Sequence, residues 1–293
     1  MAQDNKLRIL VVAAHPHDFT HVSGTCGKHM DRGDQVTVLS VTGGLKVHNE
    51  PLERELRKPK DQQDLSIINE GTAAYGERKL HELHDVCGVF GITDVRVLSF
   101  ADCPLDPSRE LDQAIMETII GVRPHVLITH APGSPASRGR VSQGADDHRI
   151  TGIATERAAG LAGNPNAETR VRPHRITKTF YMGVDWPFAD WDLIINITDQ
   201  AIRRVKAEAM FLTQGHTPGF ALKRIQIGSG VAGWNGGFPY GEAFLTASRQ
   251  IDDYLPISEV EMRHAEQPSM ERLKQMGTRI EDLLEQEGED LSG

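Results

Sequence analysis

The chain is organised around the stretch from Leu7 to Asp18, which reads LRILVVAAHPHD. After Arg8 it contains an unbroken run of apolar residues, and such a run is typical of a parallel strand that is buried on both faces. The polar residues His15, His17 and Asp18 follow directly. Because open α/β sheets bind their ligands beyond the carboxyl ends of the strands, this stretch predicts a ligand site at the end of a buried strand.

The size and charge of the chain exclude several classes of protein. A length of 293 residues with 39% hydrophobic content is enough for one large α/β domain with an appendage. A net charge of -9 and a pI of about 5.8, without a cluster of Lys and Arg, argue against a nucleic-acid partner. No apolar run reaches transmembrane length, and the polar start MAQDNK is not a signal peptide, so we expect no membrane partner. The three cysteines lack zinc-ribbon spacing, which favours reduced thiols and a cytoplasmic protein.

Predicted strands and helices alternate along the chain. A helix at 24–32 and a strand at 35–41 follow the first strand, and together they form a βαβ unit. Further strands are predicted at 95–100, 125–129, 177–182 and 193–197, and further helices at 67–90, 111–122, 149–161, 199–212 and 270–287. The pattern predicts an α/β fold with a mostly parallel sheet and a less regular C-terminal part. We expect one catalytic domain over residues 1–250 and a helical extension over residues 251–293.

Three residues have the types and spacing of a metal site. His15 and Asp18 are three residues apart across a turn that Pro16 fixes, so an imidazole and a carboxylate can converge on one ion. His148 follows a loop rich in Gly, Pro and Ser and stands near the start of a predicted helix. Two histidines and one aspartate leave a fourth position for water, which is the pattern of catalytic zinc, and zinc lowers the pKa of that water to about 7. The same residues suit Fe²⁺ equally, and the sequence does not separate the two metals.

Together with the surrounding motifs, these residues resemble the LmbE/PIG-L family of zinc-dependent N-deacetylases. The family's AHPDD motif, at the end of its first strand, corresponds to AHPHD at residues 14–18, and its HPDH motif corresponds to ADDH at residues 145–148. Further family motifs match Gly24, Gly27, Thr42-Gly43-Gly44, Glu82, Phe90-Gly91, Asp102, Tyr240, Glu242 and Phe244. The resemblance covers roughly the first two-thirds of the chain well. It implies a Rossmann-like fold with helices on both faces, zinc held by His15, Asp18 and His148, and a homo-oligomer.

Two positions depart from the family pattern, and both handle protons in the family. The family's general base is the first Asp of AHPDD, and here that position is His17. Its second catalytic histidine opens HPDH, and here that position is Ala145. We therefore expect His17 or Asp147 to act as the base. His130, at the end of the strand at 125–129, is expected to be a buried histidine; an acid or base that replaces the histidine missing at 145 is the alternative.

The substitution of Asp by His also changes which substrates the site favours. It removes one negative charge, and the resulting positive site favours an anionic substrate. Arg138 and Arg140 lie in the loop before His148 and could clamp a carboxylate. Asp102 follows the strand at 95–100 and could bind a substrate hydroxyl; a turn-forming Asp before Pro104 is the alternative.

Three functions remain open at this stage. Our main prediction is a zinc-dependent hydrolase that cleaves an N-acyl amide, such as an N-acetyl group on a small polar substrate. The alternative is a zinc-dependent hydratase or lyase that acts on a small unsaturated di- or tricarboxylate. The oxalomesaconate hydratase branch of the family resembles this chain in its departures at both positions. A weaker alternative is a metal-binding protein without catalytic activity.

Overall fold

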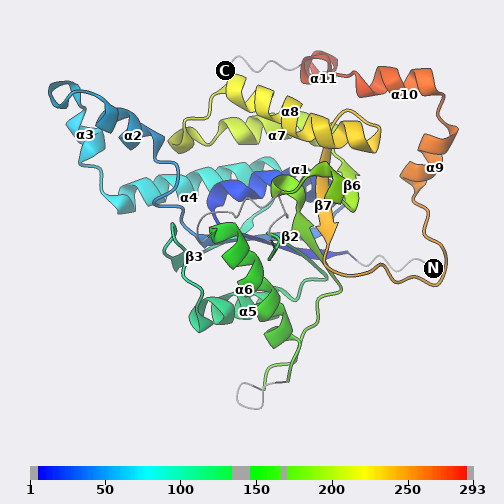
Figure 1. The fold of residues 1–293 in the computed structure, drawn as a ribbon, viewed down its shortest axis with the longest axis horizontal. Helices are drawn as coiled ribbons and strands as arrows, with labels where there is room; N and C mark the ends of the chain where they lie inside the picture. Colours follow the sequence, from blue (N-terminus) through cyan, green and yellow to red (C-terminus); the bar gives the residue numbers. More distant parts are fainter. Residues whose placement is uncertain (1–5, 134–145, 166–169, 289–293) are drawn as a thin grey trace.

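The computed structural model describes residues 6–133, 146–165 and 170–288. A seven-stranded sheet in the order β3-β2-β1-β4-β5-β7-β6 carries helices on both faces (Figure 1). The strands are β1 (Arg8–Ala13), β2 (Gln35–Thr42), β3 (Asp94–Phe100), β4 (Val126–Thr129), β5 (Lys178–Met182), β6 (Leu193–Asn196) and β7 (Gly241–Thr246). β1 to β5 pair in parallel, and β7 is antiparallel to both β5 and β6. The predicted fold class, an α/β Rossmann-like domain with a mostly parallel sheet, is confirmed.

β1 is the strand that positions the site. It lies between β2 and β4, and Val11 pairs with Val38 on one side and Ile128 on the other. Every residue of β1 after Arg8 is buried. Because β2 lies on one side of β1 and β4 on the other, the strand order reverses here, and such a switch point opens a crevice at the carboxyl ends of the strands. His15 follows β1 at this crevice.

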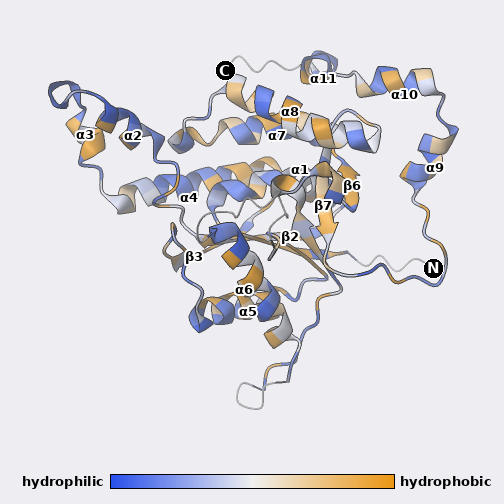
Figure 2. Ribbon diagram, in the orientation of Figure 1, coloured by the Kyte–Doolittle hydropathy of each residue, from blue (hydrophilic) through white to orange (hydrophobic). Residues whose placement is uncertain are grey.

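Two helical layers cover the sheet. One face carries α1 (Ser23–Asp31), α4 (Thr72–Val89) and α7 (Ala201–Ala209), and the other carries α5 (Arg109–Val122) and α6 (Asp147–Ala162) (Figure 1). Successive side chains of a strand point to opposite faces, so Ile9 and Val11 enter one core while Leu10 and Val12 enter the other. Figure 2 shows the strands coloured mainly as hydrophobic, whereas the helices carry both polar and apolar residues. This pattern explains why β1 appears in the sequence as a continuous apolar run.

Residues 215–240, which are rich in glycine and aromatic side chains, contain a helix that is not predicted from the sequence. α8 (Pro218–Gly236) begins after Thr217, whose side chain accepts a hydrogen bond from the backbone of Phe220. A Cβ on Gly233 would lie 2.5 Å from the carbonyl oxygen of Pro239, so this glycine allows the following chain to pack closely against the helix. β7, which is not among the strands predicted from the sequence, adds a strand between β5 and β6.

The C-terminal part also differs from the prediction. It forms α9 (Glu259–Glu266), α10 (Ser269–Met276) and α11 (Ile280–Glu287), so the single helix expected over 270–287 is wrong. Gly277 separates α10 from α11, and glycine is a poor residue for a helix interior. Ile280 and Leu284 anchor α11 in a core that it shares with α7 and α8.

The charged residues between β2 and α4 fold mainly as α2 (Glu50–Arg57), followed by the short α3 (Leu65–Ile68). None of the helices in the described parts of the chain is both long and apolar enough to span a bilayer.

Candidate metal centre

The chain turns sharply where β1 ends, and local hydrogen bonds fix that turn. Pro16 begins the 3₁₀ helix η1 (Pro16–His21), in agreement with the preference of proline for the first helical position. The backbone N–H of His15 donates to Asp18 Oδ2 at 2.8 Å, and the N–H of Asp18 donates to the carbonyl of His15 at 3.1 Å. These contacts hold the His15 and Asp18 side chains on the same side of the turn.

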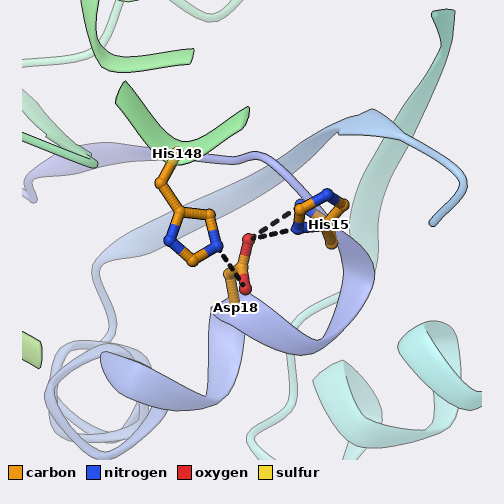
Figure 3. Close-up of side chains that lie close together, drawn as sticks. All are labelled: His15, Asp18 and His148. Atoms are coloured by element: carbon orange, nitrogen blue, oxygen red, sulfur yellow. Dashed lines mark hydrogen bonds and ion pairs between the residues drawn. The ribbon is translucent and has the colours of Figure 1, made fainter. Parts of the chain in front are cut away.

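The three predicted metal ligands meet at this turn (Figure 3). His148 comes from the first turn of α6, where the side chain of Asp146 accepts a hydrogen bond from the His148 N–H at 3.0 Å. Its Nε2 lies 3.4 Å from Asp18 Oδ1, and His15 Nδ1 lies 3.4 Å from Asp18 Oδ2. One carboxylate thus stands between two imidazoles that are more than 130 residues apart in the sequence.

This geometry fits a tetrahedral zinc ion. Zinc bound at 2.0–2.1 Å by nitrogen and oxygen ligands separates neighbouring ligand atoms by about 3.4 Å. The two measured separations, from His148 to Oδ1 and from His15 to Oδ2 of Asp18, are both 3.4 Å, and ligand atoms of the three residues lie within 4.8 Å of one another. The side chains of His15 and Asp18 are 11% and 7% exposed, whereas that of His148 is 27% exposed, so the centre opens to solvent on the His148 side. The two imidazoles and one carboxylate therefore form a suitable and accessible set of metal ligands.

The electrostatic environment keeps Asp18 ionised. Burial alone would raise the pKa of Asp18, but its contacts with the rings of His130, His148 and His15 hold that pKa well below the usual value. Burial would likewise lower the pKa of His15, yet its contacts with Asp18 and Asp147 raise that pKa overall. A permanently charged, desolvated carboxylate among imidazoles favours a bound cation.

Asp147 supports the centre from behind His15. Its Oδ2 lies 3.0 Å from His15 Nε2 and accepts the N–H of Cys103 at 2.9 Å, while its Oδ1 accepts the N–H of Leu105 at 2.8 Å. With Nε2 protonated toward Asp147, His15 presents an unprotonated Nδ1 to the metal position. The carboxylate predicted as a possible base is thus occupied by three donors and orients a metal ligand.

His130 lies beside the predicted ligands. It follows β4, is 2% exposed, and its Nε2 lies 3.2 Å from Asp18 Oδ2. Its ring stacks on that of His148, with centroids 4.2 Å apart and an interplanar angle of 8°. The expectation of a buried histidine at this edge is confirmed, and the stacking restricts the orientation of the His148 ring.

His17 belongs to a second cluster, although it is adjacent in sequence to Asp18. Its Nε2 lies 2.9 Å from Oε1 of Glu208 on α7, and the same oxygen lies 3.2 Å from His216 Nδ1 and 3.2 Å from Arg224 Nε. We call His17, Glu208, His216 and Arg224 the Glu208 cluster. Nothing in the sequence marks Glu208, because its partner His17 is 191 residues away.

The pKa directions define the charges of the Glu208 cluster. Burial lowers the pKa of His17 more than Glu208 raises it, so His17 is neutral at pH 7. Burial alone would raise the pKa of Glu208, but hydrogen bonds from His17 and His216 keep it below its ordinary value. His17 Nε2 therefore donates to an ionised carboxylate, and its Nδ1 remains without a proton.

Of the three residues predicted to bind substrate, the structure describes only Asp102. Asp102 is 2% exposed, and its carboxylate accepts the backbone N–H groups of Leu45 and Lys46 at 3.2 and 2.8 Å. This side chain therefore holds the loop after β2. Arg138 and Arg140, predicted to bind an anionic substrate, lie outside the described residues, as does Ala145.

Solved structures of similar fold include both deacetylases and a hydratase. An N,N'-diacetylchitobiose deacetylase from Pyrococcus horikoshii matches with a TM-score of 0.64 and 18% identity, over 83% of this chain and 84% of that chain. A 4-carboxy-2-hydroxymuconate hydratase from Pseudomonas putida matches with a TM-score of 0.66 and 16% identity, over 85% of this chain and 100% of that chain. The conserved protein TT1542 from Thermus thermophilus matches with a TM-score of 0.67 and 20% identity, over 86% and 99%. At these identities the likeness establishes the fold.

The family assignment rests on the sequence. No curated protein gives a significant match. The profile of the PIG-L family, described as GlcNAc-PI de-N-acetylase, matches residues 10–159, which include most of β1, the turn with His15 and Asp18, and the start of α6 with His148. This match spans just over half of the 293 residues, and the chain therefore belongs to the PIG-L family.

Proposed function

We propose that the protein is a zinc-dependent hydrolase that cleaves an N-acyl amide, such as an acetamide, of a small polar substrate. The observation that carries this proposal is the convergence of His15 and His148 on Asp18 at the spacing of zinc ligands, on the side of the site that is open to solvent. Membership of the PIG-L family supports the same reaction class. Fe²⁺ in place of zinc is compatible with this ligand set.

In this proposal, zinc supplies Lewis-acid polarisation of the acyl oxygen and lowers the pKa of the attacking water. Asp147 holds His15 in the tautomer that leaves Nδ1 free, and His130 restricts the ring of His148 by stacking. Both contacts fix ligand orientation before substrate arrives, which reduces the reorganisation needed during the reaction.

We propose His17 as the general base. Its Nε2–H is held by Glu208, so the unprotonated Nδ1 is the atom available to accept a proton. A ring nitrogen of His17 lies within 4.8 Å of a carboxylate oxygen of Asp18, a distance that one water molecule can bridge. Asp147 is the other predicted base, but its three hydrogen bonds favour the orienting role described above.

A hydratase acting on a small unsaturated di- or tricarboxylate is the second candidate. Two observations favour it: His17 and Ala145 replace both proton-handling residues of the deacetylase pattern, and one structure of similar fold is a 4-carboxy-2-hydroxymuconate hydratase. Addition of water to an activated double bond requires a proton shuttle but no group that protonates a departing amine. A metal-binding protein without turnover is the third and weaker candidate.

A paired assay on the zinc-loaded full chain distinguishes these reactions. One arm measures amine release from N-acetyl sugars and N-acyl amino acids, and the other follows loss of conjugated absorbance from unsaturated di- and tricarboxylates. Amine release that His148→Ala removes would support the hydrolase. Loss of absorbance without amine release would contradict the hydrolase and support the hydratase. No reaction in either arm would favour the metal-binding protein without turnover.

We also propose that the catalytic domain spans residues 1–250, that residues 251–293 form an extension, and that the chain forms a homo-oligomer. α8 supports the last point, because it exposes an apolar stripe at helical spacing that comprises Phe220, Ile227, Val231 and Trp234. Light scattering tests it, and a monomer at all concentrations would contradict it.

A further inference from the structure

A pocket of about 290 Å³ lies next to the metal centre, on the side of η1, α8 and β7. Its lining includes His21 from η1, Arg204 from α7, Arg224 and Ile225 from α8, and Glu242 from β7. A ring nitrogen of His21 lies within 4.8 Å of an Asp18 carboxylate oxygen, so one wall of the pocket reaches the metal ligands. His21 therefore links the lining of the pocket to the metal ligands.

Arg204 contributes a buried hydrogen-bond donor that has no acceptor. Its Nη1 donates to Ser229 Oγ at 2.5 Å and lies 3.3 Å from Glu242 Oε1, and its Nη2 donates to the carbonyl of Thr20. Its Nε is buried and, among the described residues, has no hydrogen-bond partner. A buried unsatisfied donor costs free energy, and a ligand that supplies an acceptor would remove that cost.

Arg224 contributes two further groups of donors nearer the solvent. Its Nε lies 3.2 Å from Glu208 Oε1, which anchors the guanidinium, and its side chain is 35% exposed. Within the described parts of the chain, its Nη groups form no hydrogen bond. Arg224 therefore adds to the pocket lining a guanidinium, a group that can bind a carboxylate in a bidentate manner.

The neighbouring carboxylates are partly occupied by donors other than the two arginines, although Glu208 Oε2 is buried and has no hydrogen-bond partner among the described residues. Glu242 accepts the backbone N–H groups of Gly24 and Thr25 at 2.9 and 2.7 Å. Glu208 Oε1 accepts from His17 and His216. Each arginine thus lies beside one carboxylate and retains donors that this carboxylate does not use.

The rest of the pocket wall is largely apolar. Val184, Trp191, Ile225 and Ile227 line it, and the indole N–H of Trp191 already donates to the carbonyls of Gly183 and Trp186. The wall therefore accommodates a hydrocarbon body rather than the hydroxyl-rich surface of a sugar.

We propose that this pocket binds the carboxylate of the substrate, that Arg224 is the residue that selects it, and that the substrate is a small N-acyl amino acid rather than a neutral N-acetyl sugar. The reaction named here rests on the proposed function, whereas the carboxylate subsite rests on the pocket alone. A hydratase with a dicarboxylate substrate would use the same subsite.

Calorimetric titration of the zinc-loaded full chain tests the subsite. The probes are N-acetyl-L-leucine and its neutral counterpart N-acetyl-L-leucinamide, with phenyl phosphate as a separate arm. We expect the carboxylate to bind about 10- to 100-fold more tightly than the amide, the usual value of a charge-assisted pair of hydrogen bonds. We expect Arg224→Met to reduce this ratio to near one and Arg224→Lys to give an intermediate ratio, because lysine keeps the charge without the planar fork. Arg263→Met, on the exposed side of α9, is the matched control.

Several outcomes would overturn the proposal. They are equal affinity of the wild type for the acid and the amide, no binding of either, tighter binding of phenyl phosphate, or an unchanged ratio in both folded Arg224 variants. Selective binding of the acid without amine release would uphold the subsite and count against the hydrolase. Amine release without selectivity for the acid would uphold the hydrolase and count against the subsite.

Discussion

His15 and His17 are two residues apart, but they serve two clusters with different chemistry. His15 joins Asp18 and His148, and the nitrogens there surround one ionised carboxylate at the spacing of metal ligands. His17 joins Glu208, His216 and Arg224, where N–H donors surround one ionised carboxylate. The first arrangement is suited to a cation, whereas in the second a guanidinium already supplies the positive charge.

This difference shows that residue types alone do not define a metal site. Both clusters contain two histidines and a carboxylate whose ligand atoms lie close together. In the Glu208 cluster, His216 Nδ1 also lies 3.1 Å from the carbonyl of Glu208, so that nitrogen carries a proton and does not face a metal as a ligand. The hydrogen bond on the other ring nitrogen decides whether a histidine is a ligand or a donor.

The largest expected effect comes from removing a residue of the metal cluster. We expect His148→Ala to lose zinc and to abolish turnover, because two ligands remain for an ion that needs at least three from the protein. Metal analysis after dialysis, together with the paired assay, measures both effects. His84→Ala, on the exposed face of α4, is the control and should retain both zinc and activity. Stoichiometric zinc in His148→Ala would contradict the ligand assignment.

Replacement of His17 should lower turnover without a change in zinc binding. We expect His17→Ala to lower kcat about 10²- to 10⁴-fold, the usual contribution of a general base, with a smaller change in KM. Zinc content should remain that of the wild type, because His17 is not among the proposed ligands. An unchanged kcat would show that His17 is structural and that the base lies elsewhere.

The buried carboxylate of the second cluster should contribute mainly to stability. We expect Glu208→Gln to lower the free energy of unfolding by about 3 kcal/mol at pH 7, because it breaks a buried network of charged groups. The pKa of Glu208 is lowered in the folded state, so its contribution is present above the unfolded value near 4.5 and is lost as pH falls. The difference in the free energy of unfolding between Glu208→Gln and the wild type should therefore become smaller below that pH.

Urea denaturation at several pH values measures this effect, and Glu77→Gln on the exposed face of α4 is the control. If Glu208→Gln released zinc as completely as His148→Ala, the result would contradict the separation of the Glu208 cluster from the metal site.

The smallest effect is expected from the residue behind His15. Asp147→Asn keeps the shape of the side chain but weakens the hydrogen bond that fixes the His15 tautomer. We expect zinc affinity to fall about 10- to 100-fold, the usual effect of such a supporting contact. Competition with a chelator measures the zinc affinity. An affinity equal to that of the wild type would contradict the orienting role of Asp147.

The sequence predicted the parts of the molecule whose cause is local. The apolar run of β1 and the three-residue spacing of His15 and Asp18 depend on neighbouring residues, and His148 was recognised from its motif before a helix. Glu208 was not predicted, because a glutamate on an amphipathic helix has no local feature that marks its distant partners. α8 is not predicted from the sequence either, because glycines disfavour a helix and the close packing that requires Gly233 and Gly236 exists only in the folded chain.

Anomalous diffraction at the zinc absorption edge, from crystals grown with zinc, tests the central claim most directly. The account predicts one strong peak bonded to His15 Nδ1, an oxygen of Asp18 and His148 Nε2, with no peak in the Glu208 cluster. A peak between His17, Glu208 and His216, or no peak at Asp18, would contradict it.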